Sequence, residues 1–394
     1  MNKWETSFLR EIVELDTNCD EKRNYSQCTD VIRRYCEEAG LGVEIYDSNH
    51  DGIPQPNIVA RMDAGSSTDV LLCSHYDVVP AGDLPSWTRP PFALTIEGDR
   101  AYGRGVNDDK GNIVACVSAA RELAQDKTSR VNYVILISPN EEAGGVWGID
   151  YLVNGPPRVR GDFCIVVDSS PAYVSIGSSG VLAGVITVHG TQGHAGYPYR
   201  FNNAIHLSVP LLNVLLDYVD IRNNVVSRLP APPFSPNKNI WGRFSLTMYH
   251  AGSRTNVIPG KAEISFDCRL IPEEDPEVVA AEFSTFFERA KEETCVDADL
   301  RFTTKARGWN SDPSNPFVKA FLRAVQSEVS PSITLAADLG GNDGHYFTAV
   351  GIPTACYGTL AEDTNIHGVD EFMRLADFEN VKRSLIRFAR TWQT

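Results

Sequence analysis

The feature that most constrains this chain is a set of apolar runs that end at ionisable residues. The runs VLLCSHYD, VNYVILISPNEE and GDFCIVVD end at His75 and Asp77, at Glu141 and Glu142, and at Asp168. A strand that is buried on both faces does not hold a charge in its interior. Ionisable residues at the C-terminal ends of such strands meet in one crevice of an open parallel sheet, where α/β proteins place their chemistry.

An acidic pair follows a Gly-Arg-Gly turn. In GRGVNDD, Asp108 and Asp109 stand before GNIVACVSAARELAQD, which has the pattern of a helix packed on a sheet. Adjacent carboxylates alone are typical of a solvated loop or of a helix N-terminus, where the dipole favours them. Their place at the same predicted sheet edge makes them candidates for the same site.

The chain is too long for one comfortable hydrophobic core, since it has 394 residues. Strands and helices alternate up to about residue 178, which predicts an α/β architecture. Residues 180–301 then follow the order strand, helix, two strands, helix, strand, which is typical of a small α+β sandwich. We therefore predict a discontinuous catalytic domain of residues 1–179 and 302–394, with residues 180–301 as an inserted domain.

Charge and composition exclude several classes of function. The formal net charge of −15 repels nucleic acid and anionic membrane, whereas it is compatible with a divalent cation. No apolar run reaches the roughly 18 residues of a membrane span, and the N-terminus has the pattern of an amphipathic helix rather than a signal peptide. The nine cysteines form no CxxC pair, so we expect reduced thiols and a cytoplasmic protein.

The ionisable residues at the sheet edge are of the types that bind divalent metals. Carboxylate oxygens and imidazole nitrogens are the usual ligands, and hydrolytic centres commonly hold two ions about 3.5–4 Å apart. Five residues would suffice: His75, Asp108, Glu142, Asp168 and, after the last strand, His367. Each residue taken singly is as well explained by an ordinary surface hydrogen bond or a strand end. Only the joint pattern of the five residues indicates a metal site.

Seven segments carry a resemblance to a known family. They are SHYDVVP, GRGVNDDKG, the PNEE pair, VVD, GTQGHAGYP, NVIPGKAEISFDCRL and NIHGVDEF, and they run in that order from about residue 70 to residue 372. They resemble the motifs of the acetylornithine deacetylase, succinyl-diaminopimelate desuccinylase, aminoacylase and glutamate carboxypeptidase family of two-zinc hydrolases. The resemblance implies a zinc-exopeptidase-like catalytic domain with a mixed, mostly parallel sheet, and an inserted ferredoxin-like dimerisation or lid domain.

The same resemblance implies roles for the residues at the sheet edge. Two divalent ions, zinc or else cobalt or manganese, would share one aspartate, with the ligand sets His75, Asp108, Asp168 and Asp108, Glu142, His367. Asp77 would orient His75, and Glu141 would be the general base. The resemblance also implies a cis peptide bond between Asp108 and Asp109.

Residues of the insert, and one loop beyond it, are implied to contact the substrate. His194 resembles a histidine that reaches across from a partner subunit to the oxyanion, which implies a homodimer. Asn256 and Arg269 resemble residues that contact the substrate's carboxylate and scissile carbonyl. In GGNDGHYF, His345 stands where the resemblance leads us to expect an arginine, and a histidine can donate only one hydrogen bond to a carboxylate.

The sequence therefore predicts a dinuclear metal-dependent amidohydrolase that removes an acyl group from an N-acyl amino acid. Two alternatives stay open: a carboxypeptidase or dipeptidase acting on short peptides with a free C-terminal carboxylate, and a noncatalytic relative that binds a metal or an amino-acid derivative. A serine or cysteine hydrolase is disfavoured, because the sequence has no GxSxG elbow and no cysteine within a nucleophile motif.

Overall fold

The computed structural model describes residues 1–393, and the chain divides into two compact units. Unit 1 comprises Met1–Ile176, Ser311–Ala336 and the chain from Asn342 onward, and unit 2 comprises Gly177–Asn310 and Ala337–Gly341. The predicted insert, residues 180–301, falls inside unit 2, which continues to Asn310. The segment Ala337–Gly341 joins unit 2 through bonds that sequence does not reveal, such as the one from the Ser179 backbone N–H to the Asp338 carbonyl.

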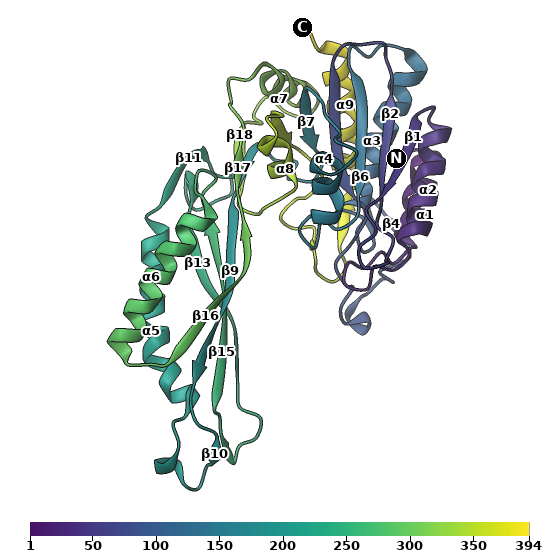
Figure 1. Ribbon diagram of the computed structural model, residues 1–394. Helices are drawn as coiled ribbons and strands as arrows, with labels where there is room; N and C mark the ends of the chain where they lie inside the picture. Colours follow the sequence, from purple (N-terminus) through teal and green to yellow (C-terminus); the bar gives the residue numbers. More distant parts are fainter. Residues whose placement is uncertain (394) are drawn as a thin grey trace. The chain divides into compact units, whose positions relative to one another are not determined.

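Unit 1 is built on a mixed sheet whose central strands are parallel (Figure 1). The strand order is β1-β2-β6-β3-β7-β19-β8; the pairs β6–β3, β3–β7 and β7–β19 are parallel, and the outer pairs are antiparallel. The bounds are β1 (Gly42–Asp47), β2 (Pro56–Met62), β3 (Asp69–His75), β6 (Asn132–Ser138), β7 (Phe163–Val166), β8 (Val174–Ser178) and β19 (Thr354–Cys356). This architecture confirms the predicted α/β fold with a mixed sheet.

Short strands and helices complete unit 1. The strands β4 (Thr95–Glu97), β5 (Arg100–Tyr102) and β20 (Phe372–Arg374) form a separate three-stranded sheet, and β18 (Leu335–Asp338) pairs with β8. The helices are α1 (Lys3–Val13), α2 (Tyr25–Glu38), α3 (Lys110–Asp126), α4 (Tyr151–Asn154), α7 (Pro316–Glu328), α8 (Gly344–Ala349) and α9 (Leu375–Thr391). Helix α9 packs against both α3 and α7.

Helix α3 follows the acidic pair and is buried on all sides at its start. Every residue from Lys110 to Ala120 is buried. Small residues permit this close packing: a Cβ at Gly111 would lie 2.3 Å from the Val106 carbonyl oxygen. A helix that is embedded in the core to this extent fixes the position of the loop before it, and that loop carries Asp108.

Unit 2 has the predicted order strand, helix, two strands, helix, strand. Its elements are β9 (Gly180–His189), α5 (Ala204–Asn223), β13 (Arg243–Ala251), β15 (Lys261–Leu270), α6 (Pro276–Thr294) and β16 (Ala298–Ala306). The four strands form an antiparallel sheet in the order β13-β15-β9-β16, which is the ferredoxin-like arrangement. Two small ribbons pair β10 (Gly193–His194) with β14 (Val257–Ile258), and β11 (Val226–Pro230) with β12 (Asn239–Trp241). Strand β17 (Trp309–Asn310) pairs with the end of β8.

One face of the four-stranded sheet carries α5 and α6. Burial alternates strictly along β9 and β15, and the buried side chains, such as Ile186 and Phe266, form one core with residues of the two helices. Helix α5 has the length and the mean hydropathy, 1.4, of a membrane span, which the sequence analysis did not recognise. Its Leu211, Leu215 and Tyr218 pack into this core, so its apolar character is accounted for in part by the fold.

Candidate metal centre

The predicted site residues of unit 1 meet because three neighbouring parallel strands end at one edge. His75 ends β3 and lies opposite Ser138, the last residue of β6, while Asp168 comes two residues after β7. The loop after β6 carries Glu141 and Glu142. Because the three strands are parallel neighbours, their C-terminal ends share an edge. The apolar runs of the sequence are therefore neighbouring strands whose register brings their C-terminal ends together.

Two groups of potential metal ligands share Asp108. One group is His75, Asp108 and Asp168, and the other is Asp108, Glu142 and His367; in each group the ligand atoms all lie within 4.8 Å of one another. One carboxylate oxygen of Asp108 lies 3.1 Å from His75 Nε2, and the other lies 3.1 Å from His367 Nε2. His367 Nε2 is also 3.2 Å from Glu142 Oε1. A carboxylate with one oxygen toward each group is suited to bridging two ions.

Asp77 contacts one candidate ligand, His75, and the loop that carries Glu141 and Glu142. Its backbone carbonyl oxygen lies 3.0 Å and its Oδ1 3.3 Å from His75 Nδ1. These contacts orient the ring so that Nε2 points toward Asp108. Its two carboxylate oxygens accept hydrogen bonds from the backbone N–H groups of Glu141 and Glu142, at 3.2 and 3.1 Å. A single buried carboxylate therefore positions a histidine and the loop that carries both glutamates.

A buried ion pair that the sequence analysis missed joins two ligand loops. The Glu371 carboxylate accepts from the Arg104 guanidinium and from the backbone N–H groups of Gly105, Asn107 and Asp108. Arg104 Nη2 donates to the carbonyls of His367, at 3.1 Å, and Gly368. Both side chains are almost fully buried. The signal was present, because Arg104 and Glu371 stand inside the segments GRGVNDD and HGVDEF.

Asp109 supports the loop and belongs to neither candidate ligand group. The peptide bond between Asp108 and Asp109 is cis, as the resemblance implies. The Asp109 carboxylate accepts hydrogen bonds from the Ser74 hydroxyl and the Asn112 amide, and it is fully buried. Of the two adjacent aspartates, only Asp108 therefore faces the histidines.

The site has an excess of buried negative charge. Burial, with the nearby Asp108 carboxylate, raises the pKa of Asp168 to about 8. Burial likewise raises the pKa of Glu141 well above its ordinary value, with Asp168 adding to the rise. Hydrogen bonds with Asp108 and Glu142 raise the pKa of His367 to about 10. The donor set of two imidazoles and three carboxylates fits two divalent cations, since cations would offset the repulsion among these carboxylates.

Comparison with known proteins agrees with this geometry. The sequence profile of Peptidase family M20/M25/M40 matches residues 71–391. The chain belongs to this family. With both candidate ligand groups present, it is an M20 metallohydrolase.

Relatives of this M20 protein have several named activities. Over 372 residues it is 30% identical to the succinyl-diaminopimelate desuccinylase of Acidovorax ebreus (strain TPSY), and the match covers 90% of each chain. Its fold is similar to that of an M20 family metallo-carboxypeptidase from Sulfolobus solfataricus, with a TM-score of 0.83, 17% identity and 99% of each chain covered. It is also similar to human carnosine dipeptidase 1, with a TM-score of 0.81, 16% identity, and 98% of this chain and 96% of that chain covered. At these identities the structural likeness shows the fold alone.

Three predicted site residues of the M20 protein lie in unit 2. His194 is exposed on β10, and its Nδ1 accepts a hydrogen bond from the Gly196 backbone N–H at 2.9 Å. Asn256 is exposed just before β14. Arg269, near the end of β15, donates from Nε to Asp267 at 2.8 Å. An accepting Nδ1 leaves the proton of a neutral His194 ring on Nε2, where it can be donated to a ligand.

His345 lies in unit 1, near the start of α8. Its Nδ1 lies 3.0 Å from the Asn342 carbonyl, and its ring centroid lies 3.8 Å from that of Tyr346. Burial lowers the pKa of His345, which favours the neutral ring. A neutral ring that donates from Nδ1 offers Nε2 only as an acceptor, so the predicted donation to a carboxylate requires a second proton.

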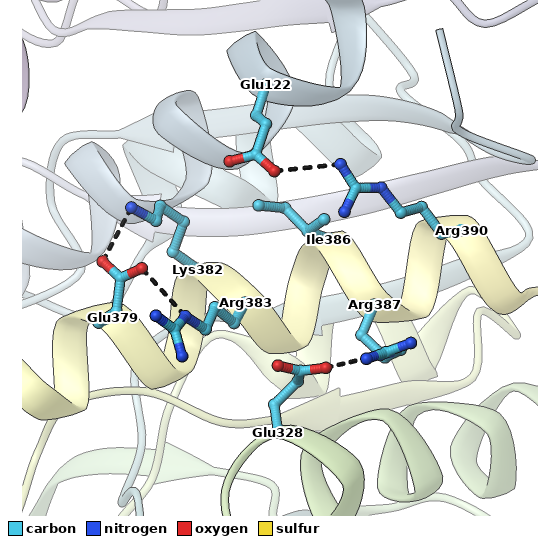
Figure 2. A pocket seen from close by; sticks show the side chains of 8 residues that line it. All are labelled: Glu122, Glu328, Glu379, Lys382, Arg383, Ile386, Arg387 and Arg390. Carbon is cyan, nitrogen blue, oxygen red and sulfur yellow. Dashed lines mark hydrogen bonds and ion pairs between the residues drawn. The ribbon is translucent and has the colours of Figure 1, made fainter. Parts of the chain in front are cut away.

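A second charged region of the M20 protein lies on α9 (Figure 2). This region, the α9 charge cluster, lines a pocket of about 410 Å³ and consists of Glu122, Glu328, Glu379, Lys382, Arg383, Arg387 and Arg390 together with Ile386. Each of its four cations contacts a carboxylate: Lys382 and Arg383 contact Glu379, Arg387 contacts Glu328, and Arg390 contacts Glu122. The pocket contains none of the predicted site residues.

Proposed function

We propose that this chain is a dinuclear metal-dependent amidohydrolase that removes an acyl group from an N-acyl amino acid. The observation that carries the proposal is the sharing of Asp108 between two candidate ligand groups. Glu141 is a member of neither group, and it lies close enough to interact electrostatically with His75 and Asp168 of one group and with Glu142 of the other. A carboxylate that stays off the metals remains available to accept a proton. Zinc fits a mixed imidazole and carboxylate donor set, and cobalt or manganese are alternatives.

The bound metal ions and Glu141 would have separate roles in the reaction. Bound there, the two ions would supply Lewis-acid chemistry toward a water molecule and an amide carbonyl. Glu141 accepts the proton of the attacking water at its carboxylate and passes it to the nitrogen of the leaving amine. Burial raises the pKa of Glu141, which makes its carboxylate a stronger proton acceptor than that of an exposed glutamate.

The substrate class is supported by the named relative and by the chain's own arginine. The desuccinylase at 30% identity acts, by its name, on an N-acyl compound, and Arg269 in unit 2 can bind a carboxylate. Carboxypeptidase or dipeptidase activity is the second candidate. It is supported by the fold shared with a metallo-carboxypeptidase and a dipeptidase, and by the absence of a guanidinium at His345.

We extend the proposal to a homodimer formed through unit 2. Helix α5 leaves Val209, Leu216 and Ile221 about half exposed. Strand β13 is an edge strand, on which Met248 and Tyr249 are exposed as well. Exposed apolar side chains together with an unpaired strand edge favour association with a second copy. His194 of one copy would then donate from Nε2 to the oxyanion in the other copy's site.

The dimer is tested by a surface variant. Replacing Leu216 with aspartate is expected to give a folded monomer that has lost activity, as measured by light scattering and by turnover of the same sample. His194→Ala in an intact dimer is expected to lower kcat without lowering metal content. Full activity in a verified monomer would contradict the proposal that His194 acts in the site of the other copy.

We also propose a cytoplasmic location. None of the nine cysteines forms a disulfide bond within residues 1–393, and all but Cys295 are buried, which suits a reducing compartment. Fractionation of the native host is the direct test, and an extracellular protein would contradict the proposal.

A substrate screen tests the function. N-acetyl, N-succinyl and N-formyl amino acids are compared with dipeptides as substrates. Each compound is tested with the protein as isolated, with the protein after a strong chelator has removed the metal, and with that protein after zinc has been added back. We expect turnover of an N-acyl amino acid that is lost with the metal and restored by it. Turnover that survives complete metal removal, or cleavage of dipeptides alone, would overturn the deacylase assignment.

A further inference from the structure

An arginine in unit 2, Arg243, is half-buried without a carboxylate partner. Its Nη2 donates to the Ser179 hydroxyl at 2.7 Å and to the Leu339 carbonyl at 3.0 Å. Its Nε is buried and has no hydrogen-bond partner, and no ion pair of Arg243 occurs within residues 1–393. A buried donor without a partner is costly, so such a group calls for an explanation.

Arg243 stands directly opposite a second arginine. In the antiparallel pairing of β13 with β15, Arg243 is the partner of Arg269. Side chains of directly opposed residues lie on the same face of the sheet, and like charges in such a pair are destabilising. Burial and the charge of Arg269 lower the pKa of Arg243 to about 10. The folded protein therefore keeps two positively charged side chains next to each other, at a cost in stability.

The face that carries the arginine pair is the one without helices. Phe244 and Cys268, the neighbours of the two arginines along their strands, belong to the core beneath α5 and α6. Since side chains alternate along a strand, Arg243 and Arg269 point to the opposite face. Only Asp267 offsets their charge by an ion pair in the described chain, through Arg269 Nε at 2.8 Å. Two guanidinium groups against one carboxylate leave a local positive charge in a protein of net charge −15.

We propose that Arg243 and Arg269 together form a subsite for one carboxylate group of the substrate, on the open face of the unit 2 sheet. This inference rests on the proposed function for the identity of the ligand. The family resemblance points to Arg269 alone, and the new element is Arg243. Guanidinium groups bind carboxylates through their N–H donors. The Nη2 donors of Arg243 are already used by Ser179 and Leu339, which hold the group in place and leave Nη1 to donate to a carboxylate. A bound carboxylate would relieve the repulsion between the two arginines.

Calorimetric titration of the zinc-loaded full chain with succinate tests the subsite directly. We expect Arg243→Met to weaken succinate binding at least tenfold. Arg243→Lys should weaken it less, because lysine keeps the charge although it loses the hydrogen bonds that hold the guanidinium in place. The matched control is Arg301→Met, which removes the same charge from the same sheet, where Arg301 lies opposite Val185 rather than an arginine. Uncharged succinamide should show no dependence on Arg243.

A purely structural role for Arg243 gives a different pattern. If Arg243 only ties Ser179 to Leu339, Arg243→Met will lower the melting temperature and leave the succinate affinity of the folded protein unchanged, which would overturn the subsite. Undetectable succinate binding to the wild type, or equal losses in Arg243→Met and Arg301→Met, would also overturn it.

Kinetics separate this inference from the proposed function. With an N-acetyl amino acid as substrate, Arg243→Met should raise KM at least tenfold and leave kcat nearly unchanged. If the wild type hydrolyses no N-acyl amino acid while succinate binding still depends on Arg243, the proposed function fails and the subsite stands. If hydrolysis proceeds with unaltered KM in Arg243→Met, the subsite fails and the function stands.

Discussion

Two regions of unit 1 gather ionisable side chains, yet only one has the features of a reaction centre. In the α9 charge cluster every cation contacts a carboxylate, and the arginines are between about one third and three fifths exposed. In the candidate metal centre, three candidate carboxylate ligands and Glu141 outnumber the two histidines. His367 is about half exposed, and the other groups are buried or partly buried. Charge balance, rather than charge density or the presence of a pocket, distinguishes a functional centre from a surface network.

The difference has an energetic origin. An exposed ion pair contributes about 0–1 kcal/mol, so the α9 charge cluster can vary at little cost. Uncompensated carboxylates in a buried site destabilise the fold until a cation binds them. Variants of the two regions should therefore respond very differently.

The largest difference should come from paired glutamate variants. Glu141→Gln removes the proposed base, and we expect kcat to fall by about 10²–10⁴ with metal content unchanged. Glu328→Gln makes the same change of carboxylate to amide in the α9 charge cluster, and it should leave kcat at the wild-type value. Steady-state kinetics and metal analysis of both proteins decide the matter, and equal turnover by the Glu141 variant would discard the base assignment.

The pH dependence of stability should separate the regions next. In the metal-free protein, the pKa of Asp168 is raised from 3.8 to about 8 and that of Asp343 to about 7. Groups with raised folded pKa values bind more protons in the native state, so stability decreases as the pH rises from about 4 to 8. We expect the metal-free protein to lose stability progressively across this window, because both carboxyl groups must give up their protons in the folded state.

Zinc should reverse this trend, because cations replace the protons and their binding releases them. Thermal melts at pH 5 and pH 8, with and without zinc, measure both effects. Metal-free protein that is more stable at pH 8 than at pH 5 would contradict the pKa shifts.

A smaller effect should follow from the ion pair that joins the ligand loops. Glu371→Gln removes the charge that holds Arg104 and the backbone of Asp108, and we expect metal affinity to fall about 10–100-fold. Chelator competition measures the affinity, and Glu379→Gln in the α9 charge cluster is the control, with affinity unchanged. Unaltered metal binding in a folded Glu371 variant would show that the pair only stabilises the fold.

The smallest effect should come from the α9 charge cluster itself. Arg387→Met breaks the pair between the exposed Arg387 and the partly buried Glu328. We expect a loss of at most about 1 kcal/mol in the free energy of unfolding, reduced further in high salt. Denaturant titration at two salt concentrations is the measurement. A loss of several kcal/mol would mean that this surface network matters as much as the buried centre.

Much of the site could be predicted from sequence because strand ends are local signals. Apolar runs that end at His75, Glu142 and Asp168 predicted candidate ligands at the ends of three adjacent parallel strands, and the motif order added His367 and Asp108 as candidates. The buried pair of Arg104 and Glu371 was missed: both residues stand inside the motifs, but their pairing across more than 260 residues is decided only by the fold. The apolar helix α5 was likewise read as an ordinary helix, although its length and hydropathy match those of a membrane span.

The sequence by itself determined the elements, their order and the residue types that the chemistry needs, because periodicity and short motifs are properties of neighbouring residues. Only the tertiary structure decided which oxygen of Asp108 faces which histidine, that Asp77 supports both His75 and the glutamate loop, and that Arg243 opposes Arg269. Those relations depend on strand register and on loops brought together from distant parts of the chain. They are set by burial and hydrogen bonding in the folded molecule, which no local pattern specifies.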